Sequence, residues 1–276
     1  MISKYATILD REIHYTEWGN QNEEIVLMWH GLFRTGRDFD DVASHLCDRF
    51  RVICPDVVGR GMSEWSPCPK EEYNVAYYAK MAEEFVACLG TGSIRWIGTS
   101  LGGIIGMQVA AGALRSKISH LILNDVGPRL SGAAIEHIRS YGSHPPGFDR
   151  LSDFERYLRT IYAAWGKLTD TQWRHIAETS HRRTSGGQFT THYDPSVAKL
   201  IPTADLVFDM WEEYDKIVAN TLCIRGEESQ LLQKEVVAEM QLRGPRCRVE
   251  TVEGVGHAPP LYDGEQLAFV RGFLES

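Results

Sequence analysis

The stretch Gly98-Thr99-Ser100-Leu101-Gly102 decides the fold of this chain. It follows the apolar run 94–97, which we expect to be a strand, and leads into residues 102–112, whose small side chains favour a helix. Glycines two residues on either side of Ser100 leave room for a sharp turn that exposes the serine hydroxyl. The pattern predicts that Ser100 is a nucleophile and that the backbone N–H of Leu101 helps to bind an oxyanion.

Composition limits the classes of protein to consider. The chain has 276 residues, of which 43% are hydrophobic, enough for one large α/β domain with an insertion. Its net charge of −8 argues against a nucleic-acid partner or an anionic membrane surface. There is no leader-like N-terminus, no long apolar run and no C-x-x-C pair. We therefore expect a soluble, cytoplasmic monomer or homodimer with reduced cysteines.

Strand and helix patterns alternate along most of the chain. Buried strands are predicted at 24–29 and 118–124, after an N-terminal hairpin, and the alternation resumes after residue 221. Between them, residues 127–214 show helix-like segments and loops instead. We predict a mostly parallel eight-stranded sheet with helices on both faces, formed by residues 1–126 and 215–276, and a helical lid over residues 127–214.

Aromatic side chains recur in the predicted lid at near-helical spacing. We expect most of them to pack the lid onto the core and one or two to line an apolar acyl pocket. The residues concerned are Tyr162, Trp165, Trp173, Phe208 and Trp211.

A second oxyanion donor is expected where the first parallel strand ends, at His30-Gly31-Leu32-Phe33. Glycine lets the chain turn there so that the backbone N–H of Leu32 faces the nucleophile. His30 is expected to support this loop.

One of the ten histidines stands at a position suited to a general base. His257 lies in a glycine-containing loop, residues 254–260, just after the last predicted strand. The carboxyl ends of parallel strands share one edge of a sheet, so His257 and Ser100 should meet there. The order of serine first and histidine last also agrees with a catalytic triad on such a sheet.

Together these motifs resemble those of the α/β-hydrolase superfamily, in its branch of lidded serine esterases and carbon–carbon-bond hydrolases. The resemblance covers nearly the whole chain and implies this fold and serine hydrolysis, but it says little about the substrate. The segments that carry it are His30-Gly31, Pro55-Asp56, Gly59-Arg60-Gly61-Met62-Ser63, Gly98 to Gly103, Asn124-Asp125-Val126-Gly127-Pro128 and Gly256-His257-Ala258-Pro259.

The third member of the triad departs from the pattern of these relatives. They usually carry an aspartate after the strand at 222–224, at the position that Gln230 occupies here. Glutamine offers no negative charge to stabilise an imidazolium, an effect whose loss costs about 10⁴-fold in a serine protease. Some relatives carry the acid after the preceding strand, where this chain has Asp125. Asp125 is the first candidate for the acid and Glu228 the second.

The resemblance and the residues predict a hydrolase that cleaves a small carboxylic ester through an acyl-enzyme. One alternative is hydrolysis of a carbon–carbon bond in a dienoate or diketone, although Leu32-Phe33-Arg34 is unlike the glycine-rich segment of such relatives. Another is a binding protein with impaired turnover, which Gln230 alone supports. We expect no metal and no cofactor, because no ligand spacing is visible and the chemistry needs neither.

Overall fold

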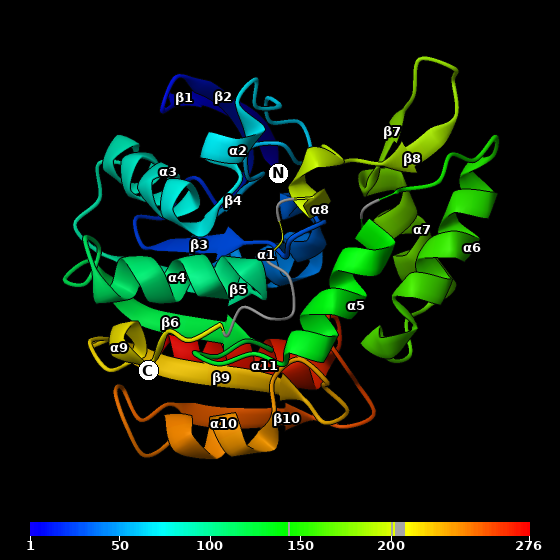
Figure 1. Cartoon of the computed structure of the whole chain (residues 1–276). Helices are drawn as coiled ribbons and strands as arrows, with labels where there is room; N and C mark the ends of the chain where they lie inside the picture. The colour runs from blue at the N-terminus through cyan, green and yellow to red at the C-terminus, as the bar shows by residue number, and fades with distance from the viewer. Residues whose placement is uncertain (143, 200, 202–207) are drawn as a thin grey trace.

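A computed structural model describes residues 1–142, 144–199, 201 and 208–276 (Figure 1). Its centre is one eight-stranded sheet, in which the first two strands run antiparallel to their neighbours and the others are parallel. The mostly parallel eight-stranded sheet predicted from the sequence is thereby confirmed. The strands, in spatial order, are β1 (Ile2–Ile8), β2 (Arg11–Trp18), β4 (Arg51–Pro55), β3 (Ile25–Trp29), β5 (Ile94–Thr99), β6 (Ile118–Asn124), β9 (Asn220–Gly226) and β10 (Arg248–Val252).

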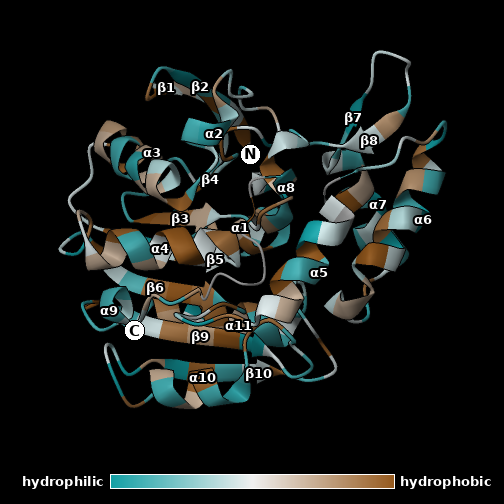
Figure 2. Ribbon diagram, viewed as in Figure 1, coloured by the Kyte–Doolittle hydropathy of each residue, from teal (hydrophilic) through white to brown (hydrophobic). Residues whose placement is uncertain are grey.

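Helices cover both faces of the sheet, as predicted. Leu27 and Trp29 of β3 face one hydrophobic core, whereas Val26 and Met28 face the other, because successive strand residues point to opposite sides. The first core is covered by α3 (Val75–Cys88), α4 (Leu101–Ala111) and α10 (Lys234–Met240), and the second by α1 (Asp40–Leu46) and α11 (Gly264–Leu274). The central strands are hydrophobic and the outer helices carry hydrophilic stripes (Figure 2).

Residues 127–214 join β6 to β9 and are called the inserted segment below. Most of it lies beyond the carboxyl ends of the parallel strands (Figure 1), while its last helix packs against α4 in the first core. Residues 143, 200 and 202–207 of the predicted lid lie outside the described residues. The elements of the segment are α5 (Gly132–Gly142), α6 (Leu151–Ile161), η2 (Ala163–Trp165), α7 (Asp170–Thr179), β7 (His181–Arg183), β8 (Phe189–Thr191), α8 (Ser196–Lys199) and α9 (Trp211–Tyr214).

The inserted segment is not purely helical. β7 and β8 form an antiparallel hairpin, where the sequence had suggested only helix-like segments and loops. Each of these strands has three residues, too few for an alternating pattern to be visible in the sequence. Two short elements of the core, η1 (Gly36–Phe39) and α2 (Pro69–Glu72), complete the structure. No helix in the described ranges has the length and hydropathy needed to cross a membrane.

Ser100 occupies a strained turn between β5 and α4. Its φ of 51° and ψ of −113° are unusual for a residue with a side chain. The turn is also tightly packed, because a Cβ on Gly98 would lie 2.3 Å from the backbone of Gly102, and a Cβ on Gly102 would lie 1.9 Å from the carbonyl oxygen of Trp29. Glycine at both positions therefore lets α4 begin directly against the end of β3.

A buried histidine joins the ends of β3 and β4. His30 is fully buried; its Nδ1 donates to the carbonyl of Gly31 at 2.7 Å and its Nε2 accepts the N–H of Val57 at 2.9 Å. Burial lowers the pKa of His30 from 6.5 to about 4, so the ring is neutral near pH 7. It supports the loop that begins at Gly31, as the sequence suggested.

Gly102→Ala should lower the free energy of unfolding by about 3 kcal/mol or more, because the new methyl group would overlap the Trp29 carbonyl. Gly272→Ala in α11 is the matched control: a Cβ there meets nothing within 4 Å, and alanine should stabilise the helix by up to about 1 kcal/mol. Urea denaturation measures both changes. Equal stability of the two variants would contradict the tight contact at Gly102.

His30→Gln should flatten the dependence of stability on pH. The neutral ring in the folded protein has a depressed pKa, so the unfolded chain binds the extra proton, and stability is lost as the pH falls from about 6.5 through about 4. The stability advantage of the wild type over the variant should shrink by about 3 kcal/mol between pH 7 and pH 4.

Urea denaturation at four pH values would measure this difference. The control is His45→Gln, which makes the same substitution at an exposed histidine. Parallel stability curves for wild type and His30→Gln would mean that His30 is not held neutral by the fold.

Candidate active site

Ser100, His257 and Asp125 form one chain of hydrogen bonds at the carboxyl edge of the sheet. Nε2 of His257 lies 3.0 Å from Oγ of Ser100, and Nδ1 of the same ring lies 2.7 Å from Oδ2 of Asp125. The three residues follow β5, β10 and β6, whose carboxyl ends meet there. Such an arrangement can remove a proton from the serine hydroxyl and hold the resulting imidazolium beside a carboxylate.

The carboxylate of Asp125 is held from several sides. The residue is fully buried, with a φ of 52°. Its Oδ1 accepts the backbone N–H of Gly226 at 2.9 Å, and its Oδ2 accepts the hydroxyl of Ser229 at 2.6 Å in addition to His257. These bonds fix the orientation of the carboxylate, so that Oδ2 faces the histidine ring.

The two other candidates for the acid lie apart from this chain. Gln230 and Glu228 are exposed, and Nε2 of Gln230 donates to the backbone carbonyl of Glu228. Ser229 instead points from this loop to Asp125. The structure thus brings Asp125, and neither Gln230 nor Glu228, against His257.

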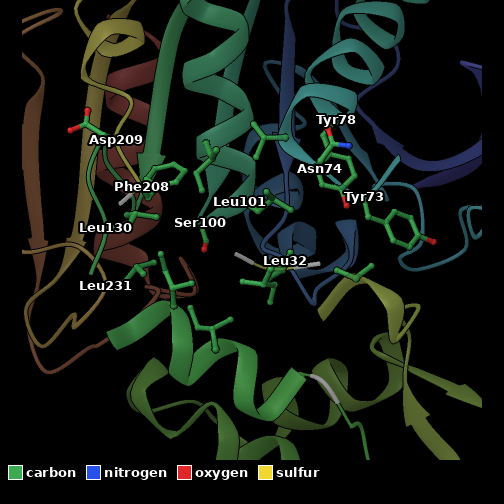
Figure 3. A pocket seen from close by; sticks show the side chains of 16 residues that line it. Leu32, Tyr73, Asn74, Tyr78, Ser100, Leu101, Leu130, Phe208, Asp209 and Leu231 are labelled. Atoms are coloured by element: carbon green, nitrogen blue, oxygen red, sulfur yellow. The ribbon is translucent and has the colours of Figure 1, made fainter. Parts of the chain in front are cut away.

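Leu32 and Leu101 flank Ser100, whose hydroxyl points into a cavity (Figure 3). Leu101 is the first residue of α4, so its backbone N–H has no acceptor within the helix. The Leu32 loop is tied down by Arg60, which is fully buried and donates from Nε to the Leu32 carbonyl at 3.0 Å. Nη1 of Arg60 donates to the Val58 carbonyl and the Tyr78 hydroxyl, both at 2.8 Å.

Two chambers meet at Ser100. The first chamber, of about 390 Å³, runs from Tyr73 and Tyr78 past Ser100 to Leu130 and Phe208, and its lining is mostly apolar (Figure 3). The second chamber, of about 440 Å³, lies on the side of His257. Its lining includes Gly31, Arg34, Tyr162, Trp165, Glu228, Gln230 and His257. Of the five aromatic residues singled out in the inserted segment, three therefore line chambers, one more than the one or two expected from the sequence, whereas Trp173 and Trp211 pack in cores.

Sequence reasoning missed the contributions of Ser229, Arg60 and Arg34. Ser229 lies one position before Gln230, the place where an acid is usual in relatives. The presence of an aspartate after β6 could have suggested that the loop after β9 supplies hydrogen-bond donors to its carboxylate. In the sequence, Arg60 stood out only as part of the segment Gly59-Arg60-Gly61-Met62-Ser63. Arg34 follows the oxyanion segment, but its direction depends on packing against Tyr162 and Trp165, which local sequence does not reveal.

A second chain of serine, histidine and aspartate lies elsewhere in the molecule. Oγ of Ser3 is 2.8 Å from Nε2 of His14, and Nδ1 of His14 is 2.7 Å from Oδ2 of Asp56. Ser3, however, lies within the extended strand β1 and not at a turn into a helix. Asp56 also accepts the backbone N–H groups of Gly36 and Met62, so this chain of bonds anchors loops of the core.

Comparison with known proteins identifies the family of this chain. A model of the Alpha/beta hydrolase family matches residues 26–268. The 3-hydroxybutyrate-oligomer hydrolase of Cupriavidus necator is 40% identical over 270 residues, which cover 94% of this chain and 92% of that protein. Two solved structures are also similar: a hydrolase from Rickettsia typhi (TM-score 0.91, 30% identity) and an α/β hydrolase from Novosphingobium aromaticivorans (0.89, 31%), each covering 99% of this chain and 98% of the other. The chain therefore belongs to the α/β-hydrolase family of enzymes.

Proposed function

We propose that this enzyme is a serine hydrolase that cleaves carboxylic esters through an acyl-enzyme intermediate. The observation that carries the proposal is the unbroken chain of hydrogen bonds from Ser100 through His257 to Asp125. The strained turn that presents Ser100 adds support, because a nucleophile at such a turn is accessible to substrate and lies beside the first N–H of a helix. The relative in Cupriavidus necator acts on 3-hydroxybutyrate oligomers according to its name, and we propose oligomers of short hydroxy acids as substrates here.

In the proposed mechanism His257 accepts the hydroxyl proton of Ser100 at Nε2, while Asp125 holds the proton on Nδ1. Oγ attacks the ester carbonyl, and the backbone N–H groups of Leu32 and Leu101 stabilise the negative oxygen of the tetrahedral intermediate. His257 then gives its proton to the leaving alcohol. Water attacks the acyl-enzyme with His257 again as the base, which frees the acid and restores Ser100.

The inserted segment is proposed to act as a lid over this site. Ile135 and Ile138 of α5 line the first chamber, and Trp165 of η2 lines the second, so the segment covers the substrate on both sides of Ser100. Exclusion of water by such a cover strengthens the hydrogen bonds to a developing oxyanion.

The two alternatives are weaker. The alternative of a binding protein with impaired turnover rested on Gln230 alone. Because a buried carboxylate already lies beside His257, no acid is needed at the position of Gln230. Carbon–carbon-bond hydrolysis would use the same three residues, so dienoate and diketone substrates belong in the same activity screen.

Ser100→Ala should lower kcat for ester hydrolysis by about 10³-fold or more and abolish labelling by a fluorophosphonate probe, with the fold intact. The matched control is Ser3→Ala, which removes a serine that also bonds to a histidine paired with an aspartate. In that control, labelling and kcat should stay within about twofold of the wild type, because Ser3 is exposed and lies outside the proposed site. Persistent labelling of Ser100→Ala would place the nucleophile elsewhere.

Asp125→Asn should lower kcat by up to about 10⁴-fold, because the imidazolium loses its carboxylate and the ring can take the wrong tautomer. Gln230→Asp should be nearly neutral, since that side chain is exposed and does not bond to His257. Steady-state kinetics of both variants test the assignment. A small effect of Asp125→Asn, together with a large gain for Gln230→Asp, would contradict it.

A further inference from the structure

The position of His257 distinguishes the roles of the two chambers. On the mechanism proposed above, His257 must return its proton to the leaving oxygen, so that oxygen has to lie within hydrogen-bond reach of Nε2. His257 lines the second chamber and not the first. The leaving alcohol therefore occupies the second chamber, and the acyl group occupies the first chamber.

Arg34 is the only lysine or arginine among the described residues that line either chamber. It is 6% exposed, and its stem lies close to the nucleophile. A Cβ built on Gly31 would be 3.6 Å from Cγ of Arg34 and 3.8 Å from Cβ of Ser100, so the two side chains border the same small space. The stem of Arg34 therefore borders the space beside Ser100, and the residue lines the leaving-group chamber.

The guanidinium of Arg34 is held rigidly. Asp38 accepts from Nε at 2.8 Å and from Nη2 at 2.5 Å, and the hydroxyl of Ser180 accepts from Nη2 at 2.9 Å. The rings of Tyr162 and Trp165 lie against the group, 4.9 and 5.0 Å from its central carbon. These three hydrogen bonds involve Nε and Nη2 and not Nη1. The hydroxyl of Tyr162 also interacts with the guanidinium.

Arg34 also keeps its charge in this setting. Burial acts to lower the pKa of the group, but the carboxylate of Asp38 outweighs burial and raises the pKa above its usual value. Glu228, the one carboxylate among the described lining residues of this chamber, is exposed to solvent and so interacts only weakly with buried charges. A fixed, charged guanidinium whose Nη1 takes no part in the bonds to Asp38 and Ser180 is suited to bind a further carboxylate.

We propose that Arg34 binds a carboxylate carried by the leaving alcohol, so that the enzyme cleaves the ester bond next to the free carboxyl end of a hydroxy-acid oligomer. In a 3-hydroxy acid one methylene separates the carbon that bears the leaving oxygen from the carboxylate. That short distance suits an arginine that starts beside Ser100. This inference rests on the proposed ester hydrolysis and adds the direction in which the substrate lies.

The chemical steps balance without a further reactant. Oγ of Ser100 bonds to the acyl carbon, the acyl–oxygen bond breaks, and the serine proton passes through His257 to the leaving oxygen. The released product is the terminal hydroxy acid, with its carboxylate at Arg34. Water then releases the rest of the oligomer from Ser100.

The first test compares two substrates that differ in one charge: the dimer of 3-hydroxybutyrate and its terminal carboxamide. The wild type should have a kcat/KM about 10- to 100-fold higher for the acid, the range expected for a charged hydrogen bond. Arg34→Gln should lose most of this preference, and Arg34→Lys should retain part of it. Free 3-hydroxybutyrate should inhibit hydrolysis of an uncharged ester competitively, and more weakly in Arg34→Gln.

Two control variants separate charge recognition from structural support. Ser180→Ala removes one contact of Arg34 but keeps the charge, and Arg129→Gln removes an exposed arginine that pairs with Asp209 at the first chamber. Both should retain the preference for the acid. An equal loss of kcat/KM for acid and carboxamide in Arg34→Gln would show that Arg34 only supports the inserted segment, and would overturn the proposal.

A trimer labelled at its carboxyl-terminal unit tests the direction of binding. The first products should be labelled monomer and unlabelled dimer, whereas labelled dimer as the first product would overturn the inference.

Fluorophosphonate labelling of Ser100 is measured in parallel. If the wild type is neither labelled nor active on any ester, the proposed function fails; if it is labelled and active but ignores the carboxylate, only this inference fails.

Discussion

The contact between the start of α4 and the end of β3 is the constraint on which the proposed site depends. Gly102 lies so close to the Trp29 carbonyl that no side chain fits between them. Because the next residues after Trp29 are His30, Gly31 and Leu32, the same contact sets the distance between the serine turn and the Leu32 loop. The strained conformation of Ser100 is maintained by this packing and not by local preference.

Buried polar groups then fix what the glycine contact brings together. His30 links the ends of β3 and β4 as a neutral ring, Arg60 holds the Leu32 carbonyl, and Ser229 with Gly226 holds Asp125. Each of these groups makes at least one hydrogen bond to another strand or loop. A site assembled in this way is preorganised, so little reorganisation is needed when charge develops on a substrate.

The sequence predicted those features that depend on local backbone requirements. Glycines around Ser100, a histidine after the last strand and alternating strands and helices are written in short segments, and the sheet with its two helical layers follows from them. The β7–β8 hairpin was missed because its strands are too short to show a period.

The choice among Asp125, Gln230 and Glu228 needed three dimensions, since it depends on which of two neighbouring strand ends faces His257. The direction of the Arg34 side chain also could not be read from the sequence, because its partners Ser180 and Tyr162 are more than a hundred residues away in the chain.

The chain of bonds from Ser3 to Asp56 has a consequence for recognising hydrolases by shape. A search that matched only the side-chain atoms of serine, histidine and carboxylate would retrieve two sites from this molecule, at nearly the same distances. What separates them is the main chain: Ser100 has a left-handed φ at the first turn of a helix, and Ser3 lies in an extended edge strand. In structural surveys of this fold, the backbone torsion of the serine is therefore a more discriminating coordinate than the geometry of the triad itself.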